Sequence, residues 1–201
     1  MTLGRRAALA GIAAALLATG CKRFLRRQHP DGGADGGSEA GADAGSRFGT
    51  LYRSNVGGFQ IRFPEGKSPE VEEKRIPGAP GAVHFFKVQY GTSAFIVSYD
   101  DFAKGKNRTP EQTLDGAREA VLESTGGTIE IANPRALEGH PGLDLTVSAT
   151  TSGIQMRQRV RVYLVAERLY QTIIVAPVWS GAASFEDDFL ESFQLLNDGG
   201  P

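Results

Sequence analysis

Hydrophobic and polar residues alternate along many stretches of the chain, and a period of two predicts β-strands. The clearest stretches are residues 59–63, 83–90, 94–99, 129–131, 143–147, 154–165 and 169–176, with a weaker one at 71–76. The Gly91-Thr92 pair between the second and third stretches fits a tight hairpin turn. The last two stretches form a long hairpin, whose Ala166-Glu167 turn leaves the turn type open because neither residue favours a positive φ.

Two segments show helical patterns instead. Thr109-Pro110-Glu111-Gln112 has the form of a capping box with proline at the first helical position, and the helix that it begins should end at Gly126-Gly127. A second helix should begin near Ser184, with an apolar stripe made of Phe185, Phe189, Phe193 and Leu196. Strands grouped in hairpins together with two main helices predict an α+β fold, in which a mostly antiparallel sheet is flanked by those helices.

The start of the chain has the pattern of a bacterial export signal. Arg5 and Arg6 precede an apolar run at 7–18, which is too short to cross a hydrocarbon core of about 30 Å. The run leads into Leu17-Ala18-Thr19-Gly20-Cys21, which resembles the lipobox, where a signal peptidase cuts before a lipid-modified cysteine. We therefore expect residues 1–20 to be removed and Cys21, the only cysteine of the chain, to carry acyl chains such as palmitate.

Two alternatives stay open for this segment: an ordinary secreted protein with an unmodified cysteine, and export by the twin-arginine route. Lys22 after the cysteine favours the outer membrane, facing the periplasm, by the sorting rule of enteric bacteria. Residues 21–46 then form a basic stalk followed by a Gly-, Ala- and Asp-rich flexible linker. Residues 28–46 alone give a root-mean-square reach of about 25 Å. The linker carboxylates lack the spacing of a calcium loop.

Residues 47–198 are long enough for a single core and are expected to form one domain. Three phrases in it, GFQIRFP, LEGHPGLDLTV and RVRVYLVAERLYQTIIVAP, together with a final FLESFQLL, resemble PsbP-like domains, a group that includes DcrB-like envelope lipoproteins. The resemblance covers about residues 56–196. It implies an antiparallel sheet flanked by helices, in proteins that mostly bind or assist assembly and do not catalyse. It carries no functional residue over, because no site motif is shared.

Composition, charge and the absence of catalytic motifs argue against several classes of function. The 201-residue chain has 22 Lys+Arg against 23 Asp+Glu, which argues against a nucleic-acid-binding protein. No Gly-x-Ser-x-Gly elbow is present, and Cys21 would be consumed by lipid. His84 shares a strand face with Phe86 and Val88 and is expected to be a packed histidine, whereas His140 is expected in an exposed turn. The sequence thus predicts no enzyme activity, no metal site and no cofactor.

Arg157, Arg159 and Arg161 share one face of a predicted strand, at intervals of about 7 Å. Such a row would attract an anionic partner, although a solvated face neutralised by Asp144 or Glu130 is the simpler interpretation. A second group contains four aromatic residues, which either line an end of the sheet or belong to the core: Tyr99, Tyr163, Tyr170 and Trp179.

These patterns together predict a non-enzymatic envelope lipoprotein, attached to the membrane through Cys21, that binds or assists assembly of another envelope protein through the arginine row. The alternative is a protein that binds a small ligand in a pocket between the sheet and the helix at 110–124. An enzyme of the hydrolase type is a third, weaker alternative.

Overall fold

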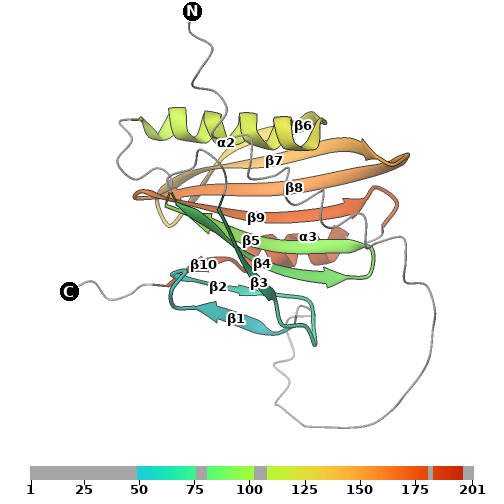
Figure 1. Cartoon of the computed structure of the whole chain (residues 1–201), viewed down its shortest axis with the longest axis horizontal. Coiled ribbons are helices and arrows are strands. Elements are labelled where there is room, and N and C mark those ends of the chain that lie inside the picture. The colour runs from blue at the N-terminus through green and yellow to red at the C-terminus, as the bar shows by residue number, and fades with distance from the viewer. Residues whose placement is uncertain (1–48, 76–80, 102–107, 181–182, 197–201) are drawn as a thin grey trace, which may run out of the picture.

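The computed structural model describes residues 49–75, 81–101, 108–180 and 183–196. Its main feature is a seven-stranded sheet in the order β3-β4-β5-β9-β8-β7-β6, in which all neighbouring strands are antiparallel (Figure 1). The strands are β3 Glu70–Arg75, β4 Ala82–Tyr90, β5 Ser93–Asp100, β6 Thr128–Leu137, β7 His140–Thr151, β8 Ile154–Val165 and β9 Arg168–Pro177. The α+β fold class and the predicted strands are confirmed, as are the hairpin of β4 with β5 and the long hairpin of β8 with β9.

Helix α2, Pro110–Thr125, covers one face of this sheet (Figure 1). The apolar side of the helix packs on one cluster of sheet residues, which includes Val83, Phe85, Ile96, Leu145, Val147, Val160 and Val162. The capping box is confirmed: Thr109 Oγ1 accepts a hydrogen bond from Gln112 N at 3.3 Å, and Gln112 Oε1 accepts one from Thr109 N at 3.2 Å. Gly126 ends the helix with a φ of 59°, as its sequence position predicts.

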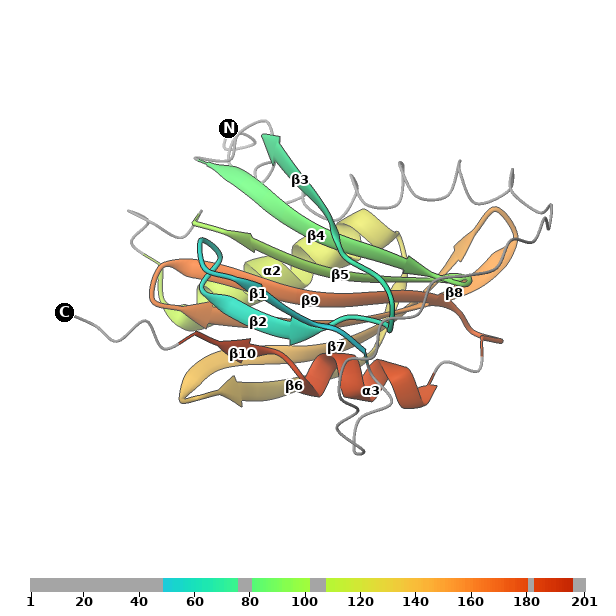
Figure 2. The same cartoon turned by 90° about the horizontal axis from the view of Figure 1, so that it is seen from below.

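The opposite face is covered by helix α3, Ala183–Glu191, and by a small second sheet (Figure 2). The second sheet has the order β1-β2-β10 and consists of β1 Leu51–Ser54, β2 Phe59–Arg62 and β10 Gln194–Leu195. Between the layers lies an aromatic cluster that includes Phe59, Phe63, Phe86, Phe95, Tyr99, Tyr163, Tyr170, Phe189 and Phe193. The domain therefore has three layers, with the large sheet in the middle.

The end of the last helix differs from the prediction. The helix stops at Glu191, and the chain continues as strand β10, which pairs with β2 through Gln194 and Gln60. Ser192 marks the change, because its Oγ accepts a hydrogen bond from Arg62 N at 3.0 Å. The tertiary pairing with β2 outweighs the helical period, and Phe193 joins the core from outside the helix.

His140 is the second correction. It was expected in an exposed turn, but the turn between β6 and β7 is Glu138-Gly139, and half-buried His140 is the first residue of β7. Pro141 stays compatible with the strand at a position opposite Ala136. The turn therefore begins at Glu138, one residue before the Gly139-His140-Pro141-Gly142 sequence.

Candidate functional site

The arginine row lies on the face of β8 that packs against α3. Arg157 Nη2 donates to both carboxylate oxygens of Glu186, at 3.1 and 3.0 Å, and Arg159 Nη1 donates to Asp187 Oδ1 at 2.7 Å. Arg161 Nη2 donates to Glu191 Oε1 at 2.7 Å. Helix α3 therefore supplies a carboxylate to each of the three arginines.

A carboxylate from the neighbouring strand completes the network. Asp144 of β7 accepts a hydrogen bond from Arg161 Nε at 3.0 Å, as the sequence allowed, while Glu130 makes no ion pair with the row in the described part. Arg135 of β6 adds a second cation beside Glu191, with Nη2 at 2.8 Å from Oε2. Four elements, β6, β7, β8 and α3, are thus linked by charge, and we call this group the arginine network.

Burial and pairing set the electrostatics of the arginine network. The side chain of Arg161 is only 4% exposed, and that of Glu186 only 1%. Partial burial acts to raise the pKa of Glu191, but the hydrogen bond and charge of Arg161 and the charge of Arg135 outweigh it and hold that pKa below its usual range. Burial acts to lower the pKa of Arg161, and its bonds to Glu191 and Asp144 raise it above its usual value. The network is a neutralised cluster, buried at Arg161 and Glu186 and exposed at Asp187 and Glu191. A role for the row in binding an anionic partner stays a prediction.

A second cluster of polar and aromatic side chains surrounds Arg168, the first residue of β9. Arg168 Nε donates to Asp101 Oδ1 at 2.6 Å, and its guanidinium lies 4.6 Å from the ring centroid of Tyr99. The bond to Asp101 raises the pKa of Arg168 above its usual value. His84 stacks on Tyr99 with 4.5 Å between centroids and lies 3.8 Å from Glu73, so it is a packed histidine, as expected.

Of the four aromatic residues predicted either in the core or at an end of the sheet, three are in the core and one is exposed. Tyr99, Tyr163 and Tyr170 are buried, and Tyr170 Oη donates to the carbonyl of Gly57 at 2.7 Å, which joins β9 to the turn between β1 and β2. Trp179, by contrast, is 69% exposed. The core interpretation is therefore confirmed for the three tyrosines and is wrong for Trp179.

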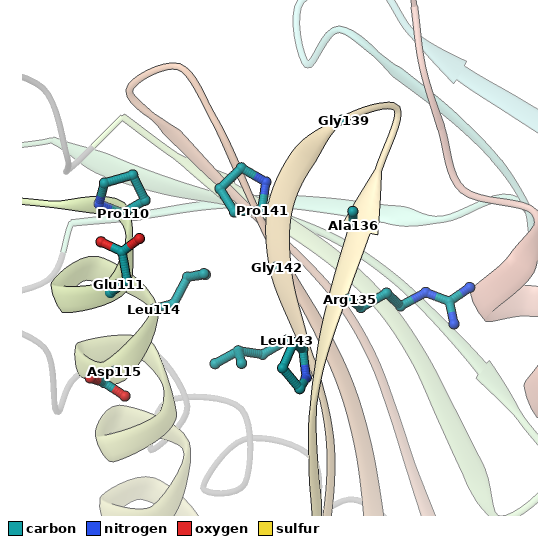
Figure 3. A pocket seen from close by; sticks show the side chains of 11 residues that line it. Pro110, Glu111, Leu114, Asp115, Arg135, Ala136, Gly139, Pro141, Gly142 and Leu143 are labelled. Atoms are coloured by element: carbon teal, nitrogen blue, oxygen red, sulfur yellow. The ribbon is translucent and has the colours of Figure 1, made fainter.

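A surface hollow of about 610 Å³ lies between the first turns of α2 and the β6–β7 hairpin (Figure 3). Leu114 from the helix and Leu143 from β7 point into it, with Glu111 and Asp115 on the helix side. The Arg135 side chain points the other way, toward α3, where it pairs with Glu191 (Figure 3). The hollow is mostly apolar with an acidic wall, and it lies beside the helix where the sequence places a ligand pocket.

Neither a metal site nor a membrane-spanning helix is present among the described residues. Within residues 49–75, 81–101, 108–180 and 183–196, no three His, Cys, Asp or Glu side chains come together in a way that would hold a metal ion. Among the same residues, no helix is both long and apolar enough to cross a membrane. Cys21, the export signal and the linker lie outside the described residues.

Comparisons with known proteins show similarity in structure and none in sequence. No protein-family profile and no curated protein matches the chain. The solution structure of cyanobacterial PsbP (CyanoP) from Synechocystis sp. PCC 6803 matches with a TM-score of 0.52 and 15% identity, over 78% of this chain and 98% of that one. LpqN, involved in cell envelope biogenesis of Mycobacterium tuberculosis, gives a TM-score of 0.42 at 10% identity, over 76% of this chain and 87% of LpqN. The match to CyanoP shows that the domain has a PsbP-like fold.

Sequence reasoning missed two parts of the sites. It did not connect the acidic residues of the last helix with the arginine row, although Glu186 and Glu191 are the main partners. The signal was present, because Asp187 and Glu191 lie four residues apart, on one side of a short helix, just as the arginines recur at strand spacing. It also did not predict the exposure of Trp179, which depends on a turn that only the structure reveals.

Proposed function

We propose that this protein is a lipid-anchored protein of the bacterial envelope, facing the periplasm, whose PsbP-like domain binds another envelope protein without catalysis. The observation that carries the proposal is the position of Cys21, the only cysteine of the chain, directly after a short apolar run that two arginines precede. The Gly- and Ala-rich composition between Cys21 and the domain supports it, because such a composition favours a flexible tether over a further folded unit.

The ion pairs of the arginine network limit which substitutions can test a partner site at Arg157, Arg159 and Arg161. Reversing all three charges would place new carboxylates beside buried Glu186 and would destabilise the domain itself. Arg159 is the informative residue, since its side chain is 20% exposed and its partner Asp187 is 65% exposed. A carboxylate of a partner protein could take the place of Asp187 there with little change in burial.

In-cell crosslinking of the full-length protein, followed by affinity purification and mass spectrometry, tests the proposal. We expect one envelope protein in stoichiometric amount, and several-fold less of it with Arg159→Gln. The melting temperature of this variant is measured alongside, because Arg159 Nη1 also lies 3.7 Å from the buried carboxylate of Glu186. Arg118→Gln is the control, because Arg118 is an arginine of α2 outside the network, 45% exposed in an ion pair with Asp115. An unchanged yield with Arg159→Gln would remove the row as the contact, and efficient crosslinking with no partner would contradict the proposal as a whole.

The hollow beside α2 favours a second candidate function, the binding of a small ligand. Its volume lies in the range of ligand pockets, and its apolar floor with a few polar groups at the wall is typical of them. Ala136→Trp would fill the hollow from exposed strand β6, whereas Ala132→Trp lies on the same strand outside it. Bound mass in native mass spectrometry that only Ala136→Trp removes would establish this function.

A further inference from the structure

Three chain segments that meet at one end of the domain contain no charged residues. There the turn between β4 and β5, the turn between β7 and β8 and the chain that leaves β9 lie together, at the right of Figure 1. Pairing fixes their positions: Ala94 lies opposite Val175, Met156 opposite Pro177, and Ile154 opposite Thr151. The three segments are residues 88–94, 149–156 and 175–180, which we call the uncharged tip, and none of them contains Asp, Glu, Lys, Arg or His.

The uncharged tip nevertheless exposes large apolar side chains. Trp179 is 69% exposed, Val178 48%, Tyr90 44% and Ile154 39%. Phe185, at the beginning of α3, extends the group, with its ring centroid 6.3 Å from that of Tyr90. Clusters of exposed apolar residues on a folded domain usually mark an interaction surface.

The fold holds Val178 and Trp179 outward. Ser180 N and Ser180 Oγ both donate to the carbonyl of Pro177, at 2.9 and 2.7 Å, which closes a turn with Val178 and Trp179 at its centre. Val178 N also donates to the carbonyl of Gln155 at 3.0 Å and fixes the turn to β8. Glycine, asparagine, aspartate and proline are usual at such central positions, so an exposed valine and an exposed tryptophan there depart from the usual turn composition.

The N-terminal tether joins the domain on the half that carries the uncharged tip. Thr50, just before β1, accepts a hydrogen bond at its carbonyl from Phe63 N at 3.1 Å. The ring of Phe63 lies 5.6 Å from that of Phe189 in α3, one helical turn after Phe185, which contacts Tyr90 of the tip. A flexible linker from Cys21 to Gly49, as the sequence predicts, would have a root-mean-square reach of about 30 Å, enough for the tip to meet the bilayer in which Cys21 would be anchored.

We propose that the uncharged tip rests on the lipid bilayer, with Trp179, Tyr90 and Ile154 inserted at the level of the headgroups. This inference rests on the proposed anchor at Cys21, which would keep the tip close to the membrane. Tryptophan and tyrosine prefer this interface because each has an apolar ring and a polar hydrogen-bonding atom. The hydroxyls of Thr92, Thr151 and Ser152 suit the same hydrated layer.

A bilayer explains the absence of charge better than a protein partner does. Charged side chains are costly to bring into a membrane, so a surface that enters it must lack them. Protein interfaces, in contrast, are enriched in arginine and surround their apolar centre with a polar rim. The nearest charged residues in the sequence, Lys87, Arg157 and Glu186, all lie beyond the ends of the three segments, and two of them pair with each other.

Trp179 is the only tryptophan of the chain, so its fluorescence tests the proposal directly. The lipidated full-length mature protein is reconstituted in phosphatidylethanolamine–phosphatidylglycerol vesicles with and without brominated acyl chains, and flotation confirms that it is anchored. We expect a blue-shifted emission that bromine quenches about twofold, since the indole would lie at the level of the upper acyl chains. Ile154→Asp should abolish the quenching, and Val71→Asp, at a 59% exposed position of β3, should not.

The outcomes separate this proposal from the anchor. Protein that floats with the vesicles but shows unquenched, solvent-like Trp179 emission overturns the tip proposal and leaves the anchor intact. A blue shift that grows with protein concentration and ignores bromine means that a second copy covers the tip, and also overturns it. If the protein does not float, the anchor fails, and titration of the same chain with brominated vesicles decides the tip alone: quenching supports it and no quenching overturns it.

Discussion

At the scale of single residues, the turn after β8 contains the clearest local strain. Ala166 has a φ of 53°, in the left-handed region that side chains with a Cβ rarely adopt. Two other hairpin turns begin with a similar residue, but Glu138 and Ser152 are each followed by a glycine, at φ 86° and 80°. The doubt that Ala166-Glu167 raises in the sequence is therefore justified: the tight pairing of β8 with β9 imposes a conformation that alanine does not favour.

Ala166→Gly should stabilise the domain by about 0.5–1 kcal/mol, because glycine adopts a positive φ without the steric cost that alanine has. Urea unfolding at neutral pH, followed by circular dichroism, measures the change. Ala136→Gly, at an exposed position inside strand β6, is the matched control and should destabilise instead. A loss of stability in Ala166→Gly would show that the turn is not strained.

Glu191 makes a second residue-scale prediction, on pH. Its pKa in the folded domain lies below its usual range, so the carboxylate stabilises the fold at pH values above about 4.3, its unfolded pKa. That contribution is lost as the pH falls through the folded pKa. Glu191→Gln should therefore lower the urea midpoint at pH 7, and its difference from the original protein should shrink as the pH falls below about 4.3.

The control for Glu191 is Glu119→Gln, at an exposed position of α2. It should lower the midpoint less than Glu191→Gln at pH 7. Equal midpoints for Glu191→Gln and the original protein at pH 7 would mean that the ion pairs with Arg161 and Arg135 add nothing to stability. Many exposed ion pairs behave in this way.

At the scale of elements, the large sheet and α2 follow from the sequence because their signals are local. Alternation defines β4, β5, β8 and β9, and the capping box together with Gly126 bounds α2. Strand β10 has only two residues, too few for a period to be seen, and the Leu-Tyr-Arg-Ser sequence of β1 does not alternate. Both are defined by pairing with β2: β1 forms a local hairpin with it, whereas β10 pairs with it from the distant end of the chain, and the early end of α3 has that second cause.

The capping box of α2 gives a prediction at this scale. Thr109→Ala removes the acceptor for Gln112 N and should cost about 1 kcal/mol of stability, while Thr109→Ser, which keeps a hydroxyl, should cost less. Because α2 covers one face of the sheet, the loss should appear as a single cooperative shift in thermal unfolding. Helix signal that melts ahead of the sheet would contradict this view of α2 as part of one core.

At the scale of the whole molecule, the sequence predicts the location of the protein more directly than a binding site. The predicted export signal and Cys21 are short linear patterns that need no fold to be recognised. The arginine row is equally visible in the sequence, but its meaning depends on α3, which lies across it and neutralises it. The exposed position of Trp179 and the hollow beside α2 arise from packing and turn geometry, so they appear only in three dimensions.

The proposed function depends most on the anchor at Cys21, and the mass of the mature protein extracted from bacterial envelopes tests this anchor most directly. We predict a chain that begins at Cys21 and carries the added mass of a diacylglyceryl group, with or without a further acyl chain, and a Cys21→Ser variant that stays uncut. A mature chain cut elsewhere, or one that begins at Cys21 without lipid mass, would contradict the account.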